Sequence, residues 1–155
     1  MWPPRGEALL LGFGNGGPPH EGQGRSRHGQ AHADLVENGF VVLFPATEHA
    51  EFDLVAYRDG CFHRVQVKYR SARLGTLSVH FRSVWADRHG THMRATDKSQ
   101  VDVMCIYSPE TDECYYLRPT EHGQSVTLRV APSKNGQARG VQMASCFRAF
   151  PVSQP

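Results

Sequence analysis

Residues 51–70 read EFDLVAYRDGCFHRVQVKYR, and the predicted fold is built around them. Two segments of strand-like composition flank Asp59-Gly60, a dipeptide that suits a two-residue turn with positive φ. The stretch is therefore predicted to form a β-hairpin in which Arg58 faces Cys61. The two predicted strands cover residues 52–57 and 62–69.

The predicted hairpin has one polar face and one apolar face. Counting back from the turn places Asp53 opposite Gln66 and Glu51 opposite Lys68. Because successive strand residues point to opposite faces, these four side chains share one face of the hairpin. The other face carries Phe52, Leu54, Ala56, Val65 and Val67. A polar cluster on a hairpin whose other face is core indicates a chemical site.

The order of the polar residues is also familiar. Asp53, an interval of twelve residues and then Gln66-Val67-Lys68 resemble the signature of the PD-(D/E)XK nuclease superfamily. The segment FDLV followed by RVQVK resembles, more narrowly, the group I intron-associated branch of this superfamily. In that branch, Gln in place of the second acid is familiar. The resemblance runs from about residue 25 to Pro119. It implies an α/β fold with a restriction-endonuclease-like core, in which an N-terminal helix packs on a mixed β-sheet.

The resemblance also implies roles for the residues of this face. Asp53 would be the main metal ligand, the backbone carbonyl of Val67 the second, and the Gln66 amide oxygen a neutral donor. Lys68 would position the attacking water and stabilise the developing anion. The implied cofactor is Mg²⁺, with Mn²⁺ able to substitute. Glu51 is either a further metal ligand or an ion-pair partner of Lys68, and both roles stay open.

A helix is predicted over residues 25–38, ending against Gly39. In the resembled nucleases this helix usually carries a glutamate that joins the metal site. The matching position here holds His28 or, with a shift, Gln30, and neither is a carboxylate. His28 is expected to bind a metal or act on a proton if it faces the site. The alternative is an ordinary surface histidine.

Basic residues gather directly after the hairpin. The whole chain carries a net charge of only +2, yet residues 64–98 hold eight Lys or Arg against two acids. Such a segment suits a polyanion, whose affinity is dominated by phosphate contacts, while a solvated Arg-rich loop is the alternative. The residues expected to bind DNA are Arg70, Arg73, Arg82, Arg88, Arg94 and Lys98.

The 155 residues suit one domain with a modest core. Residues 1–24 are rich in Gly and Pro and are expected to form a flexible tail, residues 25–150 the nuclease-like domain, and residues 151–155 a second tail. A loop or short helix that touches substrate is expected over 84–100, and a mobile basic loop over 132–140. Further strands are predicted at 40–45, 76–82, 101–107, 114–117 and 125–130.

The sequence also argues against several classes of protein. Its four Cys are widely spaced with no C-x-x-C pair, so neither a zinc ribbon nor a compact disulfide scaffold is indicated. No apolar run approaches the length needed to span a bilayer, and a reducing cytoplasm is the expected location.

The resemblance implies a metal-dependent DNA endonuclease that hydrolyses phosphodiester bonds. The most direct form is a homing-type enzyme that cuts duplex DNA as a dimer or tetramer, so that two sites reach two strands. A Holliday junction resolvase with the same core, or a restriction or repair nuclease, is an alternative within the enzyme class. Two other classes stay open, namely a DNA-binding module with a weakened site and an interaction domain whose polar face is an ion-paired surface.

Overall fold

The computed structural model describes residues 27–47, 49–132 and 141–151 of the chain. The predicted tail at 1–24 and nearly all of the predicted basic loop at 132–140 lie outside these residues. The elements in chain order are α1 (Arg27–Glu37), β1 (Val41–Leu43), β2 (Leu54–Arg58), β3 (Cys61–Tyr69), β4 (Thr76–His80), β5 (Arg82–Asp87), β6 (Gly90–Ala95), β7 (Val103–Ser108), β8 (Glu113–Leu117), η1 (Pro119–Glu121), β9 (Ser125–Arg129), β10 (Gln142–Met143) and η2 (Ala144–Phe147).

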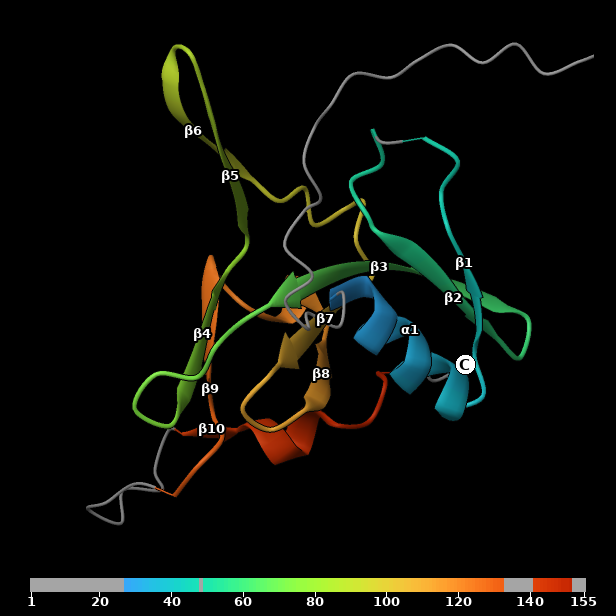
Figure 1. The fold of residues 1–155 in the computed structure, drawn as a ribbon. Coiled ribbons are helices and arrows are strands. Elements are labelled where there is room, and N and C mark those ends of the chain that lie inside the picture. The colour runs from blue at the N-terminus through green and yellow to red at the C-terminus, as the bar shows by residue number, and fades with distance from the viewer. Residues whose placement is uncertain (1–26, 48, 133–140, 152–155) are drawn as a thin grey trace, which may run out of the picture.

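A five-stranded sheet in the order β1-β2-β3-β7-β8 forms the centre of the fold (Figure 1). Strands β3 and β7 pair in parallel, whereas the other neighbours in this sheet pair antiparallel. The sheet is therefore mixed, and its first three strands follow one another in the chain, as predicted. Strand β3 has neighbours on both sides, so the hairpin quoted above is central.

The hairpin between β2 and β3 has the predicted turn. Arg58 pairs with Cys61, and Asp59 and Gly60 have φ values of 51° and 81°. Positive φ at both central residues is the geometry that favours Asp-Gly in a tight hairpin. The regular pairing ends at Leu54, because the Asp53 N–H also donates to the Val65 carbonyl at 2.9 Å.

Asp53 and Leu54 are consecutive and both pair with Val65, which is the arrangement of a β-bulge. Asp53 is therefore not in simple register opposite Gln66, as the count from the turn had placed it. A bulge changes the direction of the side chains beside it, and here it lies next to the proposed site.

Helix α1 covers one face of the central sheet (Figure 1). Ala31 and Leu35 are fully buried in a cluster with the apolar side chains of β2, β3, β7 and β8. The helix ends at Glu37, and the chain then turns at Gly39 as predicted, where a φ of 81° suits a residue without a β-carbon. Val36, the residue after Leu35, is half exposed.

A second sheet, in the order β10-β9-β4, covers the other face of the central sheet. Leu77, Val79 and Phe81 are buried, as their alternation predicts. Leu77 and Val79 belong to a second core cluster with Met104 and Ile106 of β7. The central sheet is therefore apolar on both faces, which is why β7 reads as a continuous hydrophobic run.

The prediction of a loop or short helix over residues 84–100 is wrong for residues 84–95. Strands β5 and β6 form a two-stranded antiparallel ribbon that extends away from the other sheets (Figure 1). Val84 pairs with Met93, and these two residues are 56% and 65% exposed.

Among the described residues, no helix is long and apolar enough to cross a membrane.

Candidate active site

The carboxylate of Asp53 lies between β3 and α1. Its Oδ2 accepts a hydrogen bond of 2.6 Å from the N–H of Val67, and its Oδ1 lies 3.5 Å from Nε2 of His28. The bulge at Asp53 and the central position of β3 explain how one side chain reaches both elements. One oxygen is fixed by the backbone, and the other faces the helix.

Residue 28, rather than residue 30, is the helical position that faces Asp53. His28 stands in the first turn of α1, and its Nε2 is buried and makes no hydrogen bond within the described residues. Gln30 lines another cavity, of about 510 Å³, together with Asp34 and Tyr107. The structure therefore places His28, and not Gln30, at the helix position beside Asp53.

A cavity of about 460 Å³ opens beside Asp53. The residues that line it come from the position just before β2, from β3 and the residue after it, and from β5: Asp53, Gln66, Val67, Lys68, Tyr69, Arg70, Arg82 and Val84. Asp53 and Lys68 therefore share one cavity, as the sequence predicted, and three cationic side chains accompany a single carboxylate. Such a lining suits an anionic group held close to Asp53.

Gln66 has long polar contacts on both sides of its amide. Nε2 donates to the Glu51 carbonyl at 3.3 Å, and Oε1 accepts from the hydroxyl of Thr96 at 3.5 Å. Thr96 is buried, and sequence reasoning did not single it out. The contact joins residues 30 positions apart, and the sequence around Thr96 carries no strand or helix period that would have signalled it.

The carboxylate of Glu51 is paired with a residue of the ribbon, a contact that the sequence did not predict. Its Oε1 forms an ion pair of 2.7 Å with Nη2 of Arg94 on β6. Lys68 was the partner expected from counting along the hairpin. Glu51 is not among the residues that line the cavity beside Asp53. The ribbon that carries Arg94 was not predicted, so this ion pair could not be expected from the hairpin alone.

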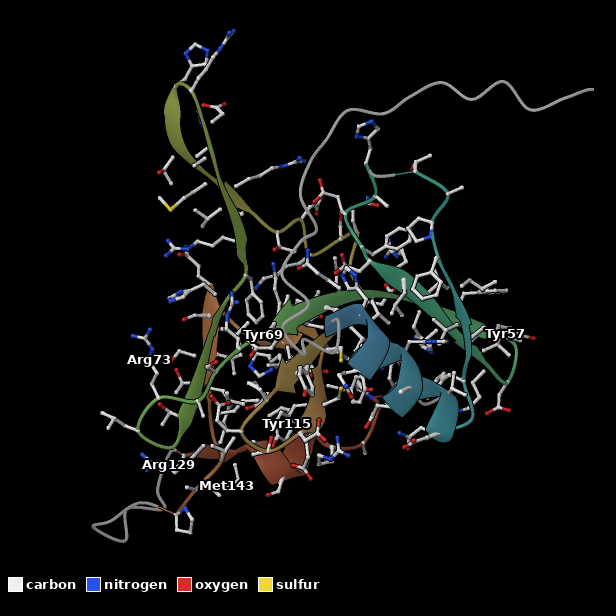
Figure 2. All side chains as sticks on the ribbon, viewed as in Figure 1. Tyr57, Tyr69, Arg73, Tyr115, Arg129 and Met143 are labelled. Atoms are coloured by element: carbon white, nitrogen blue, oxygen red, sulfur yellow. The ribbon has the colours of Figure 1, made fainter. Side chains whose placement is uncertain are left out.

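The basic residues predicted to bind DNA are spread over the surface. Arg70 and Arg82 line the cavity of Asp53. Arg73 lies on the turn before β4, at the edge of the molecule away from α1 in Figure 2. Arg88 is at the tip of the ribbon, and Arg94, although paired with Glu51, is largely exposed.

Lys98 differs from the other basic residues because its ammonium group is engaged within the fold. Nζ donates to the carbonyls of His122 and Gly123 at 2.6 and 2.5 Å and lies 4.9 Å from the centre of the Phe81 ring. These contacts tie the segment after β6 to the loop before β9. In the described structure, Lys98 is an internal anchor.

Arg64, the first residue of the basic segment, forms an ion pair with Asp102. Asp102 accepts hydrogen bonds from the Arg64 backbone N–H and from its guanidinium, at 2.8 to 3.0 Å. The side-chain hydrogen bond from Arg64 lowers the pKa of the Asp102 carboxyl below its ordinary value. Asp102 therefore orients the start of β7 and lies apart from the cavity of Asp53.

The donors around Asp53 fit a divalent cation. No group of three or more His, Cys, Asp and Glu suited to a metal occurs in the described parts of the chain. A cation would therefore rely on Asp53 Oδ1, His28 Nε2, the Val67 carbonyl, water and substrate oxygens. The buried Nε2 that lacks a hydrogen bond and faces a carboxylate oxygen is the observation that supports this fit.

A helix packed on a mixed sheet, with an acidic residue and a lysine brought together on its central hairpin, defines an α/β nuclease core of the restriction-endonuclease-like type. The chain belongs to the PD-(D/E)XK endonuclease family, whose model matches residues 21–150. This membership confirms the resemblance drawn from Asp53 and Gln66-Val67-Lys68. Nucleases of this family generally use divalent metals and act on DNA.

Solved structures agree with this assignment of the fold. The bacterial homing endonuclease I-Ssp6803I is similar, with a TM-score of 0.61 and 20% sequence identity over 79% of this chain and 83% of that chain. At this level of identity the likeness establishes the fold. A comparison with curated proteins finds no match.

Proposed function

We propose that this protein is a metal-dependent endonuclease that hydrolyses phosphodiester bonds in duplex DNA, with a homing-type role. The observation that carries the proposal is the Asp53 carboxylate, held by the Val67 N–H in a cavity that Lys68, Arg70 and Arg82 also line. Family membership supports nuclease chemistry. The homing type rests on the FDLV and RVQVK segments and on the structural likeness to a bacterial homing endonuclease.

In this proposal, the residues of the cavity divide the work. Asp53 and the carbonyl of Val67 hold the cation, Mg²⁺ or Mn²⁺, which supplies Lewis-acid polarisation of the phosphate when bound. Lys68 orients the water and stabilises the negative charge that develops on the phosphoryl oxygens. Gln66 provides a neutral amide, so it shapes the site without adding charge. Arg70 and Arg82 hold the phosphate backbone.

The β5–β6 ribbon is proposed to read the DNA. The major groove admits a two-stranded β-ribbon, and this ribbon starts at the cavity, since Arg82 and Val84 line it. Arg88 at the tip suits a phosphate or a guanine edge. The exposed pair of Val84 and Met93 suits thymine methyl groups.

Cutting both strands of a duplex calls for two sites, so we propose that the chain acts as a homo-oligomer, either a dimer or a tetramer. A single cavity beside Asp53 reaches one scissile phosphate at a time. Sedimentation of the protein alone and with duplex DNA measures this state.

The test of the proposed function is cleavage of a mixed panel in Mg²⁺ and in Mn²⁺. The panel contains supercoiled plasmid, linear duplex that carries candidate intron-insertion sites, and a four-way junction. Cleavage that Asp53→Asn and Lys68→Ala both abolish is expected. Preference for the duplex supports the homing type, whereas preference for the junction would replace it with a resolvase.

One observation favours a second function. The helix position that is acidic in the resembled nucleases holds His28, so the site has one fewer negative charge for a cation. A DNA-binding module with a weakened site would bind duplex in a salt-sensitive way and cut nothing in either metal. An interaction domain would bind no DNA at moderate salt.

A further inference from the structure

The contact between the His28 ring and the Asp53 carboxylate is not an ordinary hydrogen bond. Nε2 of His28 and Oδ1 of Asp53 are 3.5 Å apart, beyond the 2.7 to 3.2 Å of ordinary N–H···O bonds. Nε2 is nevertheless shielded from solvent, although the side chain as a whole is 42% exposed. A buried ring nitrogen that lies beside a carboxylate oxygen without bonding to it can share a third partner with that oxygen.

The separation matches two ligands of one cation. Metal–nitrogen and metal–oxygen bonds of about 2.1 Å, at angles of about 90 to 110°, place the two donor atoms about 3.0 to 3.4 Å apart. The distance of 3.5 Å between His28 Nε2 and Asp53 Oδ1 lies just above this range. The second oxygen of Asp53 is occupied by the Val67 N–H, so Oδ1 is the oxygen directed to the helix.

The helix holds the nitrogen in place before any cation binds. Ala31 and Leu35 have no exposed surface, and they fix the face of α1 against the central sheet. His28 stands about one turn before Ala31 and two turns before Leu35, and it faces the same hairpin. A donor held by a packed helix needs little reorganisation when a ligand arrives.

We infer that His28 Nε2 and Asp53 Oδ1 bind the same divalent cation, and that this nitrogen donor makes the site select transition-metal ions such as Mn²⁺ and Co²⁺ over Mg²⁺. The inference rests on the proposed function for the place of the cation, and it goes beyond it in naming the ligand and the selectivity. Mg²⁺ prefers an all-oxygen shell and sheds its water reluctantly. Imidazole favours transition metals, whose affinity for such donors rises from Mn²⁺ to Co²⁺.

Direct metal binding tests the inference without relying on cleavage. Binding of Mn²⁺ to untagged protein is followed by electron paramagnetic resonance of the free ion, and Mg²⁺ is then titrated in as competitor. Wild type is expected to bind Mn²⁺ well above Mg²⁺ in affinity. His28→Ala is expected to weaken Mn²⁺ binding by about tenfold or more, because even partners outside the ligand shell cost that much.

Two further variants make the result specific. His28→Glu replaces the nitrogen with oxygen, so it is expected to keep a cation bound while lowering the preference for Mn²⁺ over Mg²⁺. His92 is the matched control, since its Nε2 lies 3.0 Å from Asp87 Oδ1 in a second, exposed His–Asp pair on the ribbon. His92→Ala is expected to leave Mn²⁺ binding unchanged. Melting temperatures of all the variants report whether the fold is intact.

Three results would overturn the inference: folded His28→Ala that binds Mn²⁺ like wild type, an unchanged metal preference in His28→Glu, or loss of Mn²⁺ binding in His92→Ala. Its failure differs from failure of the proposed function. Wild-type cleavage together with unaffected Mn²⁺ binding in His28→Ala refutes the ligand and leaves the nuclease. Mn²⁺ binding that depends on His28, without cleavage of any DNA, supports the ligand and refutes the nuclease.

Discussion

Arg94 and Glu51 form an ion pair of 2.7 Å that joins the projecting ribbon to the loop in front of β2. The backbone carbonyl of Glu51 also accepts the amide N–H of Gln66. The loop that contains Glu51 leads directly into Asp53. One short segment therefore connects the ribbon, the β2–β3 hairpin and the proposed metal ligand.

If this ion pair orients the ribbon, Glu51→Gln and Arg94→Ala should lower kcat/KM on duplex DNA by similar factors. Melting temperatures should change little, because exposed pairs contribute about 0 to 1 kcal/mol. The double variant should be no worse than either single variant, which a double-mutant cycle measures. A metal-ligand role for Glu51 predicts a different result, in which Glu51→Gln alone weakens Mn²⁺ binding.

Lys98 and Arg88 should differ in how they affect DNA binding. Arg88→Ala should reduce the slope of log K against log salt by about 0.9 if the side chain meets one phosphate, without a loss of stability. Lys98→Met should lower the melting temperature and leave that slope unchanged, because its ammonium group is bonded to two carbonyls. Equal losses of slope in the two variants would show that Lys98 leaves these carbonyls for DNA.

The pair of Arg64 and Asp102 should make the fold sensitive to acid. The folded-state pKa of Asp102 is lowered by the hydrogen bond from Arg64, so its contribution to stability is present above the ordinary Asp value of about 3.9 and is lost as pH falls through the lowered pKa. Asp102→Asn should remove this part of the decline in melting temperature below about pH 4. Asp59→Asn, at the exposed turn, is the control and should retain it.

Packing of α1 should depend on one side of the helix. Leu35→Ala should lower the free energy of unfolding by about 2 to 5 kcal/mol, because the side chain is completely buried. Val36→Ala, at the neighbouring half-exposed position, should cost less than about 1 kcal/mol. Denaturant titration separates the two. Similar losses would contradict the packing described for α1.

The hairpin and the helix could be predicted because their signals are local. Asp59-Gly60 sets the turn, and the turn sets the pairing back to Leu54 and Val65. Gly39 marks the end of α1, and the burial of Ala31 and Leu35 follows from helical spacing. The resemblance then supplied the position of His28. These features need only neighbours in sequence, or a pattern shared with a family.

The ribbon and its contacts could not be predicted in the same way. Strand prediction relies on alternation between buried and exposed residues, and the β5–β6 ribbon has exposed apolar side chains such as Val84 and Met93. The bulge at Asp53 comes from one extra backbone hydrogen bond. The ion pair between Glu51 and Arg94 depends on the position of the ribbon. The sequence around neither residue indicates that position.

The separation of the ribbon from the central sheet has an evolutionary consequence. Strands β5 and β6 share their pairing only with each other among the described strands, whereas β3 is held by partners on both sides. Substitutions along the ribbon can therefore accumulate without changing the register that holds Asp53 against Val67. Selection can act on the two sheets at different rates, with the central sheet constrained by packing and the ribbon open to variation.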